Sequence, residues 1–242
     1  TNPGRLTLAD LSGYTAQVRA PVCGVYRVSY RICGMPAPSS GGISLLQTLG
    51  ILNHFDVAGL KANTVDSVHL VSEAYRLAYA DRAKYIADSD FVSVPVAGLL
   101  DPAYLKSRAQ LISMQKSIGT PVAGLPAGAS TAGTDTSLNL PSTSHMSIVD
   151  SAGNAVSMTT TIENGFGSLQ MVRGFLLNNE LTDFSFAPTD AQGQPIANRV
   201  QPGKRPRSSM APTLVLDKAT GQVLMSGGSP GGALIIHYTA KT

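Results

Sequence analysis

The amino-acid sequence predicts an α+β protein, with helices in its first half and antiparallel strands in its second. Apolar residues recur at helical spacing over about residues 43–112, whereas alternating runs typical of strands begin near residue 146. Separate blocks of helices and strands favour a layered α+β fold over a doubly wound parallel sheet. The 242 residues, 43% of them hydrophobic, can bury a sizeable core as one large or two small domains.

The two cysteines, Cys23 and Cys33, flank a stretch with hairpin character that follows a short helical turn from about Asp10. If the chain turns near Val28, the two sulfur atoms lie opposite each other and a disulfide becomes possible, which would imply an oxidising compartment. Two separate buried thiols fit these residues equally well. No spacing of Cys and His resembles a metal site, and we expect neither a metal nor a cofactor.

Three helices are expected in the first half. The first follows the rigid, proline-containing turn of residues 36–42. Asn63 is the expected N-cap of the second, which has apolar and aromatic residues at helical spacing as far as Tyr79. The third has Asp101 as its N-cap, with a proline at the first helical position, and is expected to run through Ile112.

Residues 117–142 have a different composition, consisting mainly of Gly, Ala, Ser, Thr and Pro with Asp135 as the single charge. This composition predicts a flexible linker. Loops of this length are uncommon within a compact domain and tend to be functional or disordered.

The strands are expected as two hairpins. Residues 146–150 and 155–161 alternate about a turn at 151–154, and residues 213–216 and 223–225 form a second such pair. A glycine-rich turn over 227–232 then leads into an apolar segment. No internal repeat is visible.

Charge excludes some functions. Only 14% of the residues are charged and the net charge is +3, without the dense basic stripe of a nucleic-acid surface. No run of eighteen apolar residues exists, so we expect no membrane span. The one basic cluster, Arg199, Lys204, Arg205 and Arg207, is either a solvated loop or a positive rim that attracts a carboxylate substrate.

Thr143 lies where the linker ends and the strand pattern begins. A threonine at such a place is usually only a strand former. If the bond between Ser142 and Thr143 is cut, however, its hydroxyl becomes a candidate nucleophile. The freed α-amino group, with an ordinary pKa of about 7.7–8.0, is then a built-in base.

Several segments together resemble one family, the γ-glutamyltransferases (γ-glutamyl transpeptidases) of the N-terminal nucleophile hydrolase superfamily. The run Thr-Ser-His-Met-Ser-Ile-Val-Asp at 143–150 is similar to the family's Thr-Thr-His start of the small subunit. Further similar segments, in the family's order, are residues 36–42, 73–82, 153–156, 166–167, 176–179, 183–185, 204–210 and 228–232.

The resemblance implies part of an αββα four-layer sandwich, incomplete in this chain. Residues 1–142 would be the C-terminal part of the large subunit, with 117–142 as the linker before the cleavage site. Residues 143–242 would be the N-terminal part of the small subunit, and both subunits would come from one precursor.

The resemblance also implies the catalytic roles. The Thr143 hydroxyl would attack the Ser142 carbonyl, and an N→O acyl shift and hydrolysis would free its amine. The same oxygen would then attack the γ-carbonyl of a glutamyl amide to give an acyl-enzyme. Thr161 corresponds to a second threonine that hydrogen-bonds to the nucleophile, and the N–H groups of Gly231 and Gly232 correspond to an oxyanion hole.

Substrate-binding residues follow from the same resemblance. The matching positions are Glu163, Glu180 and Asp183 around the α-ammonium group, and Ser208 and Ser209 at the α-carboxylate. Glu163 stands where many members carry an asparagine. A solvated loop edge and a simple turn are the alternatives for these residues. Strand alternation places His145 on the side of Thr143, where we expect structural support rather than a proton shuttle.

The expected function is hydrolysis of γ-glutamyl amides such as glutathione, or transfer of the acyl group to amino acids and peptides, in a periplasmic or secreted protein. One alternative is a glutaryl or cephalosporin acylase of the same fold, which has less use for acidic residues at 180 and 183. Another is a non-catalytic relative that serves as a scaffold or binding module. The family's carboxylate-binding arginine belongs to a part absent from this chain, so we expect this piece alone to be inactive.

Overall fold

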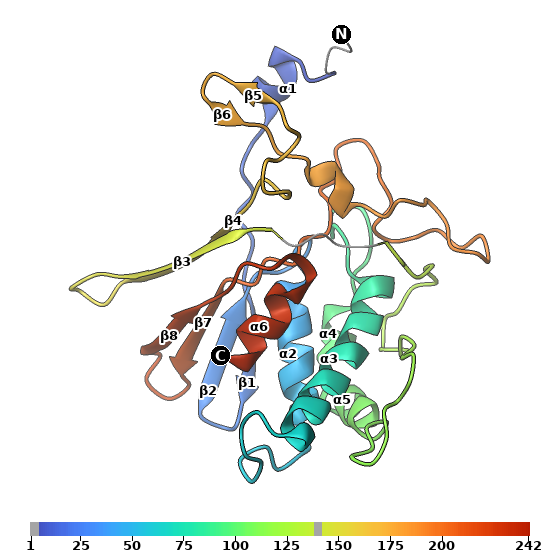
Figure 1. Ribbon diagram of the computed structural model, residues 1–242, viewed down its shortest axis with the longest axis vertical. Helices are drawn as coiled ribbons and strands as arrows, with labels where there is room; N and C mark the ends of the chain where they lie inside the picture. Colours follow the sequence, from blue (N-terminus) through green and yellow to red (C-terminus); the bar gives the residue numbers. More distant parts are fainter. Residues whose placement is uncertain (1–4, 138–141) are drawn as a thin grey trace.

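The computed structural model describes residues 5–137 and 142–242. Residues 1–4 and 138–141, which include the last part of the expected linker, lie outside the described residues. A four-stranded antiparallel sheet is covered on one face by a layer of helices (Figure 1). The predicted α+β class is confirmed, and the two layers form part of a sandwich.

Each half of the chain supplies one hairpin of the sheet, in the strand order β1-β2-β7-β8. The strands are β1 (Val22–Tyr26), β2 (Tyr30–Gly34), β7 (Thr213–Asp217) and β8 (Val223–Gly227). Strand β2 pairs with β7, so Ile32 lies opposite Val215. This central pairing joins segments that are far apart in the sequence, and it positions the second half of the chain on the first.

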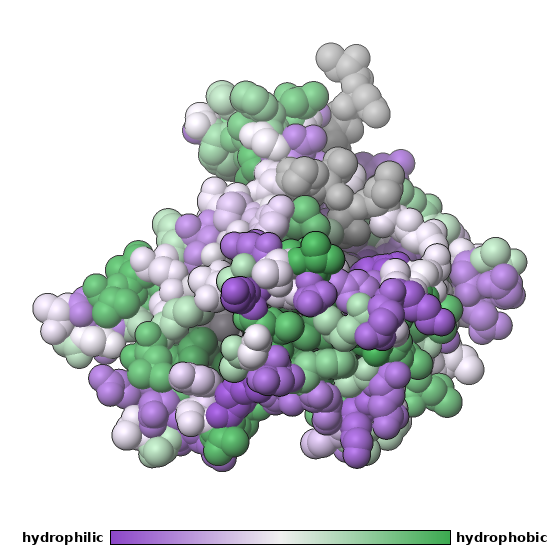
Figure 2. Space-filling view, turned by 60° about the horizontal axis from the view of Figure 1, so that its bottom comes forward, coloured by the Kyte–Doolittle hydropathy of each residue, from purple (hydrophilic) through white to green (hydrophobic). Residues whose placement is uncertain are grey.

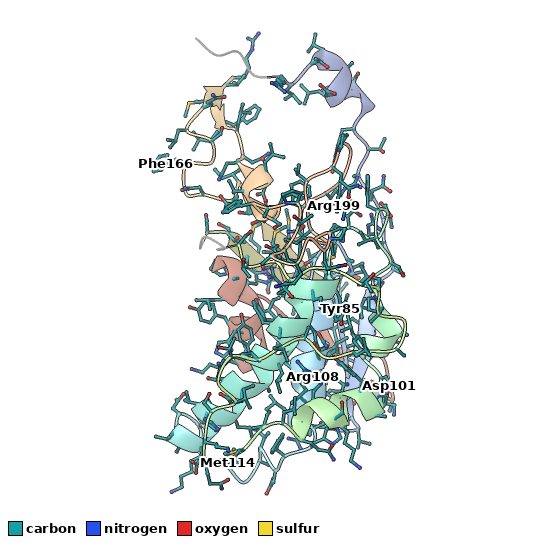
Figure 3. The ribbon with its side chains drawn as sticks, turned by 90° about the vertical axis from the view of Figure 1, so that its right-hand side faces the viewer. Tyr85, Asp101, Arg108, Met114, Phe166 and Arg199 are labelled. Atoms are coloured by element: carbon teal, nitrogen blue, oxygen red, sulfur yellow. A yellow bond between two sulfur atoms is a disulfide. The ribbon has the colours of Figure 1, made fainter. Side chains whose placement is uncertain are left out.

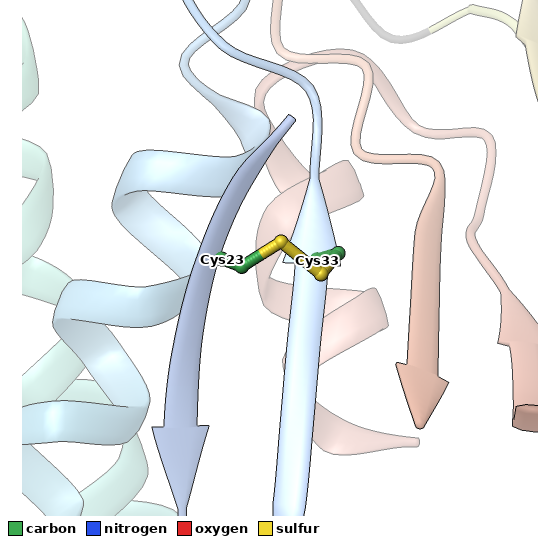
Figure 4. The surroundings of a disulfide bond; sticks show 2 residues. All are labelled: Cys23 and Cys33. Carbon is green, nitrogen blue, oxygen red and sulfur yellow. A yellow bond between two sulfur atoms is a disulfide. The ribbon is translucent and has the colours of Figure 1, made fainter. Parts of the chain in front are cut away.

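The two cysteines form a disulfide between β1 and β2 (Figure 4). Cys23 and Cys33 are directly opposite in the strand register, with their Cα atoms 4.1 Å apart. The hairpin turns where Arg27 and Val28 adopt φ values of 50° and 68°. Of the two arrangements that the sequence left open, the disulfide is therefore the one present.

Helix α2 (Gly41–Leu52) is the centre of the helical layer and is buried on nearly every side. One face packs on the sheet and on α6 (Ile235–Lys241), through Leu46, Ile32 and Ile236. Its other side meets α3 (Val65–Tyr85) and α5 (Pro102–Ala109). Two short helices, α1 (Leu8–Gly13) and α4 (Val96–Leu99), are also present. A helix enclosed in this way explains why its apolar pattern is not confined to one stripe.

Two helix boundaries differ from the prediction. The N-cap of α3 is Thr64 rather than Asn63, because Thr64 and Ser67 exchange hydrogen bonds in a capping box. Asn63 instead takes a left-handed conformation with φ 60° just before the cap. Helix α5 begins at Pro102 with Asp101 as its cap, as predicted, but ends at Ala109.

The described part of the expected linker, residues 117–137, is attached to the helical layer at several points. The N–H of Gly124 donates to Asp81, and the N–H of Ile118 donates to Glu73. Asp135 is 7% exposed and forms an ion pair with Arg207, with an N–O distance of 3.0 Å. Composition alone gives no sign of these attachments, since most of them use backbone groups.

Two of the four residues in the basic cluster are buried, so a solvated loop is the wrong interpretation for them. Arg207 is 4% exposed and Lys204 is 7% exposed. The Lys204 ammonium donates to the carbonyl oxygens of Ala197 and Arg199 and to the side chain of Gln201. Both cations hold the loop together from inside, and neither contributes to a positive surface.

Two further hairpins extend from the layers. Strands β3 (Ser144–Val149) and β4 (Ala155–Thr160) pair with each other and cross the sheet near β8 (Figure 1). The small hairpin of β5 (Met171–Val172) and β6 (Phe175–Leu176) projects from the body. The apolar side chains of this hairpin are exposed, as the upper part of Figure 2 shows. Phe166, which precedes the hairpin in the sequence, lies far from Tyr85 and Arg108 of the helical layer (Figure 3). Among the described residues, none of the helices combines the length and the apolar character that a membrane span requires.

Asp135→Ala is expected to lower the free energy of unfolding by about 3–5 kcal/mol, because it leaves the buried Arg207 guanidinium without its partner. Urea unfolding measures this. Asp66→Ala, which removes an exposed carboxylate in the first turn of α3, is the matched control and should cost about 1 kcal/mol or less.

The double variant Asp135→Leu with Arg207→Met should recover part of the loss, since apolar groups of similar size can replace a buried pair. Burial alone raises the pKa of Asp135, but Arg207 and hydrogen bonds hold that pKa below its usual range. The stabilisation is therefore present at neutral pH and is lost as the pH falls through the acidic range. Equal stability of Asp135→Ala and Asp66→Ala would show that the ion pair contributes little.

Candidate active site

A small pocket lies where β3 begins, β4 ends and the glycine-rich turn enters α6. Its lining residues are Ser142, Thr143, Thr161, Glu163, Asp183, Ser208, Ser209, Met210, Gly232, Ala233 and Ile235. Most of the residues expected at the site from the sequence are thus brought together. Gly231 directly precedes Gly232, which lines the pocket. Glu180 lies on the short 3₁₀ helix η1 (Glu180–Asp183), which also carries Asp183. The cavity measures about 20 Å³, which is room for about one water molecule.

The bond between Ser142 and Thr143 lies in this pocket, in a chain that is described uncleaved. Thr143 has φ 136°, a region that a β-branched residue adopts only under strain. The carbonyl oxygen of Ser142 accepts a hydrogen bond from the N–H of Gly232, at 3.3 Å. The carbonyl next to the candidate nucleophile therefore already faces a backbone donor.

The glycine-rich turn has a conformation that needs glycine. Gly231 has φ 134° and Gly232 has φ 56°, and the short 3₁₀ helix η2 (Gly232–Leu234) continues into α6. Of the two glycines, Gly232 is the one that donates to Ser142. A preorganised N–H of this kind stabilises negative charge that develops on a carbonyl oxygen.

Thr161 follows the last residue of β4, one position beyond the strand. Its hydroxyl oxygen accepts a hydrogen bond from the N–H of Glu163, at 2.8 Å. Because the hydroxyl accepts from the backbone, its own proton remains to be donated into the pocket that it lines. This geometry suits a residue that hydrogen-bonds to another hydroxyl.

Three carboxyl groups gather on one side of the pocket. Glu163 is 6% exposed, and its carboxylate accepts a hydrogen bond from the side-chain amide of Asn179. Asn179 also accepts from the N–H of Asn164, so it ties the segment after β4 to the segment that leads into η1. The family resemblance covered residues 176–179 without assigning Asn179 to the site.

Glu180 and Asp183 resist ionisation in this setting. Burial raises the pKa of Glu180 to about 7, helped by the charges of Asp183 and Glu163. Burial and the charge of Glu163 raise the pKa of Asp183 to about 6, against the opposing effect of Arg82 and Arg207. A group of acids whose charges repel one another favours a bound cation, which would relieve the repulsion.

The two serines are held by contacts from the first half of the chain. The Ser209 hydroxyl accepts a hydrogen bond from the guanidinium of Arg82 on α3, at 2.5 Å. Arg82 is 2% exposed and also donates to the hydroxyl of Ser40. The Ser208 hydroxyl accepts from the N–H of Met210, and its carbonyl accepts from the N–H of Ser40. Arg82 is a residue that the sequence matched to the family without assigning it to the site.

His145 is bound within the β3–β4 hairpin. Its Nδ1 lies 2.9 Å from the hydroxyl of Thr159 and its Nε2 lies 3.1 Å from that of Ser147. The ring packs against Gly228, where a Cβ atom would come within 2.3 Å of it. Burial lowers the pKa of His145. These contacts suit structural support of the strand that starts at the nucleophile.

Within residues 5–137 and 142–242, no group of three or more His, Cys, Asp or Glu side chains has the arrangement of a metal site. The groups that face this pocket include hydroxyls, carboxylates and backbone N–H groups.

Comparison with known proteins identifies the family. The family model described as gamma-glutamyltranspeptidase matches residues 1–242. The chain belongs to the γ-glutamyltranspeptidase family. The sequence resemblance is confirmed, together with the N-terminal nucleophile hydrolase fold.

Relatives of this chain carry two kinds of name. A glutathione hydrolase proenzyme of Bacillus subtilis (strain 168) is 42% identical over 250 residues, covering 99% of this chain and 41% of the relative. An acylase ACY 1 proenzyme of Pseudomonas sp. (strain SE83) is 38% identical and covers 97% of this chain and 39% of the relative. The crystal structure of cephalosporin acylase from Bacillus halodurans matches with a TM-score of 0.79 at 28% identity, covering 96% of this chain and 38% of that one. The family member described here thus spans about two fifths of the length of these relatives.

The pH dependence of stability tests the carboxyl group cluster. The folded pKa values of Glu180 and Asp183 lie above the ordinary ones, so their contribution to stability is fully present below pH 4 and is lost as the pH rises through about 6 and 7. Without substrate, the chain should therefore melt at a lower temperature at pH 8 than at pH 5.

Glu180→Gln should make this loss smaller, because a neutral amide has no charge to repel Asp183. The exposed substitution Asp66→Asn is the control and should keep the original pH dependence. Melting curves at the two pH values decide the matter, and an unchanged profile in Glu180→Gln would argue against the repulsion.

Proposed function

We propose that the whole protein cleaves itself between Ser142 and Thr143 and then acts as a γ-glutamyltransferase or hydrolase with Thr143 as its nucleophile. The hydrogen bond from Gly232 to the Ser142 carbonyl oxygen is the observation that carries this proposal. This hydrogen bond polarises the Ser142 carbonyl group, which is the group that Thr143 must attack for self-cleavage. The strained φ of Thr143 supports the same step.

Self-cleavage would proceed by an acyl shift. The Thr143 hydroxyl oxygen attacks the Ser142 carbonyl carbon, and the Gly232 N–H stabilises the resulting oxyanion. Collapse breaks the peptide C–N bond and leaves an ester on the Thr143 oxygen, while the nitrogen becomes an amine. Water then hydrolyses the ester, which gives a Ser142 carboxylate and a Thr143 with free hydroxyl and free amine. Breaking the bond also removes the restriction on φ of Thr143.

Turnover would reuse the same groups. Departure of the Ser142 end opens the pocket, which has no space for a substrate before cleavage. The Thr143 oxygen attacks the γ-carbonyl carbon of a glutamyl amide while the Thr143 amine takes the hydroxyl proton. Collapse breaks the amide C–N bond, and the Thr143 amine passes that proton to the departing nitrogen, which leaves as a free amine. The acyl-enzyme then passes the γ-glutamyl group to water, an amino acid or a peptide. Thr161 would hydrogen-bond to the nucleophile throughout.

Substrate recognition would divide between the two sides of the pocket. The acidic side of Glu163, Glu180 and Asp183 suits the α-ammonium group, and the hydroxyls of Ser208 and Ser209 suit the α-carboxylate. The names of the relatives include an acylase as well as glutathione hydrolases. The acidic group favours the γ-glutamyl substrate, since a glutaryl group has no ammonium to bind.

Residues 1–142 and 143–242 would belong to the large and small subunits that the cut produces from one precursor. The name proenzyme, which the relatives carry, supports such processing. A periplasmic or secreted location is supported by the Cys23–Cys33 disulfide, because disulfides persist in oxidising compartments.

Thr143→Ala in the full-length protein should abolish self-cleavage, because no hydroxyl remains to attack Ser142. Thr143→Ser retains a hydroxyl and should cleave. Intact mass spectrometry with N-terminal sequencing over time measures both. A new N-terminus at residue 143 in the alanine variant would rule out the proposed nucleophile, and an uncut unsubstituted protein would favour a non-catalytic relative.

Asp183→Asn should lower γ-glutamyl turnover by about 10²-fold or more, since it removes a charged partner of the substrate ammonium worth about 3 kcal/mol. Glutaryl release from a β-lactam nucleus should stay constant or rise. Both activities are measured on the same cleaved preparation, with Asp66→Asn as the control. Equal effects on the two substrates would remove Asp183 from the proposed ammonium site.

A further inference from the structure

Two tyrosine hydroxyls converge on one carbonyl oxygen next to the oxyanion turn. Tyr75 donates to the carbonyl oxygen of Ala233 at 2.8 Å, and Tyr79 donates to the same oxygen. A carbonyl oxygen has two lone pairs and can accept both bonds. Ala233 follows Gly232 directly, so the shared acceptor lies one residue from the N–H that faces Ser142.

The two tyrosines are part of a packed assembly on one face of α3. They are one helical turn apart, and their ring centroids are 4.1 Å from each other. The ring of His237 on α6 meets Tyr75 edge-on, with centroids 4.7 Å apart. The guanidinium of Arg82 lies over the ring of Tyr79, 5.0 Å from its centroid. Each tyrosine ring therefore has a packing contact in addition to the hydrogen bond that its hydroxyl donates.

Within the turn, the N–H of Leu234 donates to the carbonyl oxygen of Gly231 at 3.1 Å. The absence of a side chain lets Gly231 and Gly232 adopt positive φ values. It also means that nothing in these two residues holds the backbone in that conformation. A donor aimed at an oxyanion is useful only if its direction is fixed before the reaction. An external anchor on the next residue supplies what the glycines lack.

We propose that Tyr75 and Tyr79 are positioning residues for the oxyanion hole, and that they act by anchoring the carbonyl of Ala233. The proposal rests on the proposed function, because it assigns a role in both self-cleavage and turnover. Neither tyrosine lines the pocket, so each acts through the turn and not on the substrate.

Burial raises the pKa of both hydroxyls. Both phenols therefore remain protonated donors at neutral and alkaline pH, and the anchor is present over the whole working range.

The test compares Tyr75→Phe, Tyr79→Phe and the double variant with Tyr85→Phe, all in the full-length protein. Tyr85 lies on the same helix and donates to the carbonyl of Gly124, and neither residue lines the pocket. Each substitution thus removes one phenol-to-carbonyl bond of α3. The rate at which the new N-terminus at Thr143 forms is followed by mass spectrometry, and kcat and KM are measured with a γ-glutamyl anilide after cleavage is complete.

The double variant should cleave itself about 10²-fold more slowly and lose kcat by a similar factor, while KM changes by less than about twofold. Each single variant retains one anchor and should lose about 3- to 10-fold. Tyr85→Phe should keep the rate, kcat and KM of the unsubstituted protein, although its melting temperature falls as much as that of the single variants.

Single-variant rates within twofold of Tyr85→Phe, or a rise in KM at constant kcat, would overturn the positioning role. These single variants decide the question even if the double variant does not fold. Failure of the unsubstituted protein to cut at Thr143 is a different result. It would reject the proposed function, and the positioning role with it.

Discussion

The buried guanidinium of Arg207 connects the parts of the chain that build the pocket. It forms an ion pair with Asp135 on the segment that leads to Thr143, and it donates to the carbonyl oxygen of Arg82 on α3. The N–H of Arg207 donates to the side chain of Asn198, whose amide donates in turn to the carbonyl of Asp183. Burying a guanidinium group costs roughly several kcal/mol in lost hydration, and the protein tolerates this only because the ion pair and hydrogen bonds compensate. The segment before Thr143, the acidic side of the pocket and α3 are therefore all joined to one residue, through its guanidinium and its backbone N–H.

Around this connection, the pocket combines groups that are each unfavourable alone. Thr143 has a strained backbone, and the raised pKa values of Glu180 and Asp183 mark carboxyl groups that burial and repulsion disfavour as anions. Proteins tolerate such features where the surrounding structure holds them. The proposed cleavage would relieve the strain at Thr143, and a bound ammonium group would relieve the repulsion between the carboxyl groups.

Local patterns were sufficient for the features that depend on local sequence. The hairpins, the facing cysteines, the glycine turn and the Asp101 cap follow from turn chemistry and alternation within short windows. The predicted N-cap of α3 was wrong by one residue, since Asn63 and Thr64 are neighbours and both residue types are good caps. The pocket residues around Thr143 were predicted from the family resemblance, because the similar segments follow one another in the family's order.

Features that depend on burial and on distant partners were not predictable from the sequence. Lys204 and Arg207 belong to a charged loop by composition, and only the fold shows that their heads are enclosed. The β2–β7 pairing, the Arg82–Ser209 bond and the two phenols on Ala233 all join residues from opposite halves of the chain. A pattern within one window contains no information about such partners.

The central β2–β7 pairing has a consequence for the protein after the proposed cut. The two products would share one sheet, with β1 and β2 from one polypeptide and β7 and β8 from the other. Before the cut, the two hairpins find each other within a single chain, at the effective concentration set by the connection. Afterwards the same sheet must form between separate molecules, so refolding becomes concentration-dependent and competes with aggregation. The mature protein would then survive by unfolding slowly, because its route back to the native state is lost once the bond is broken.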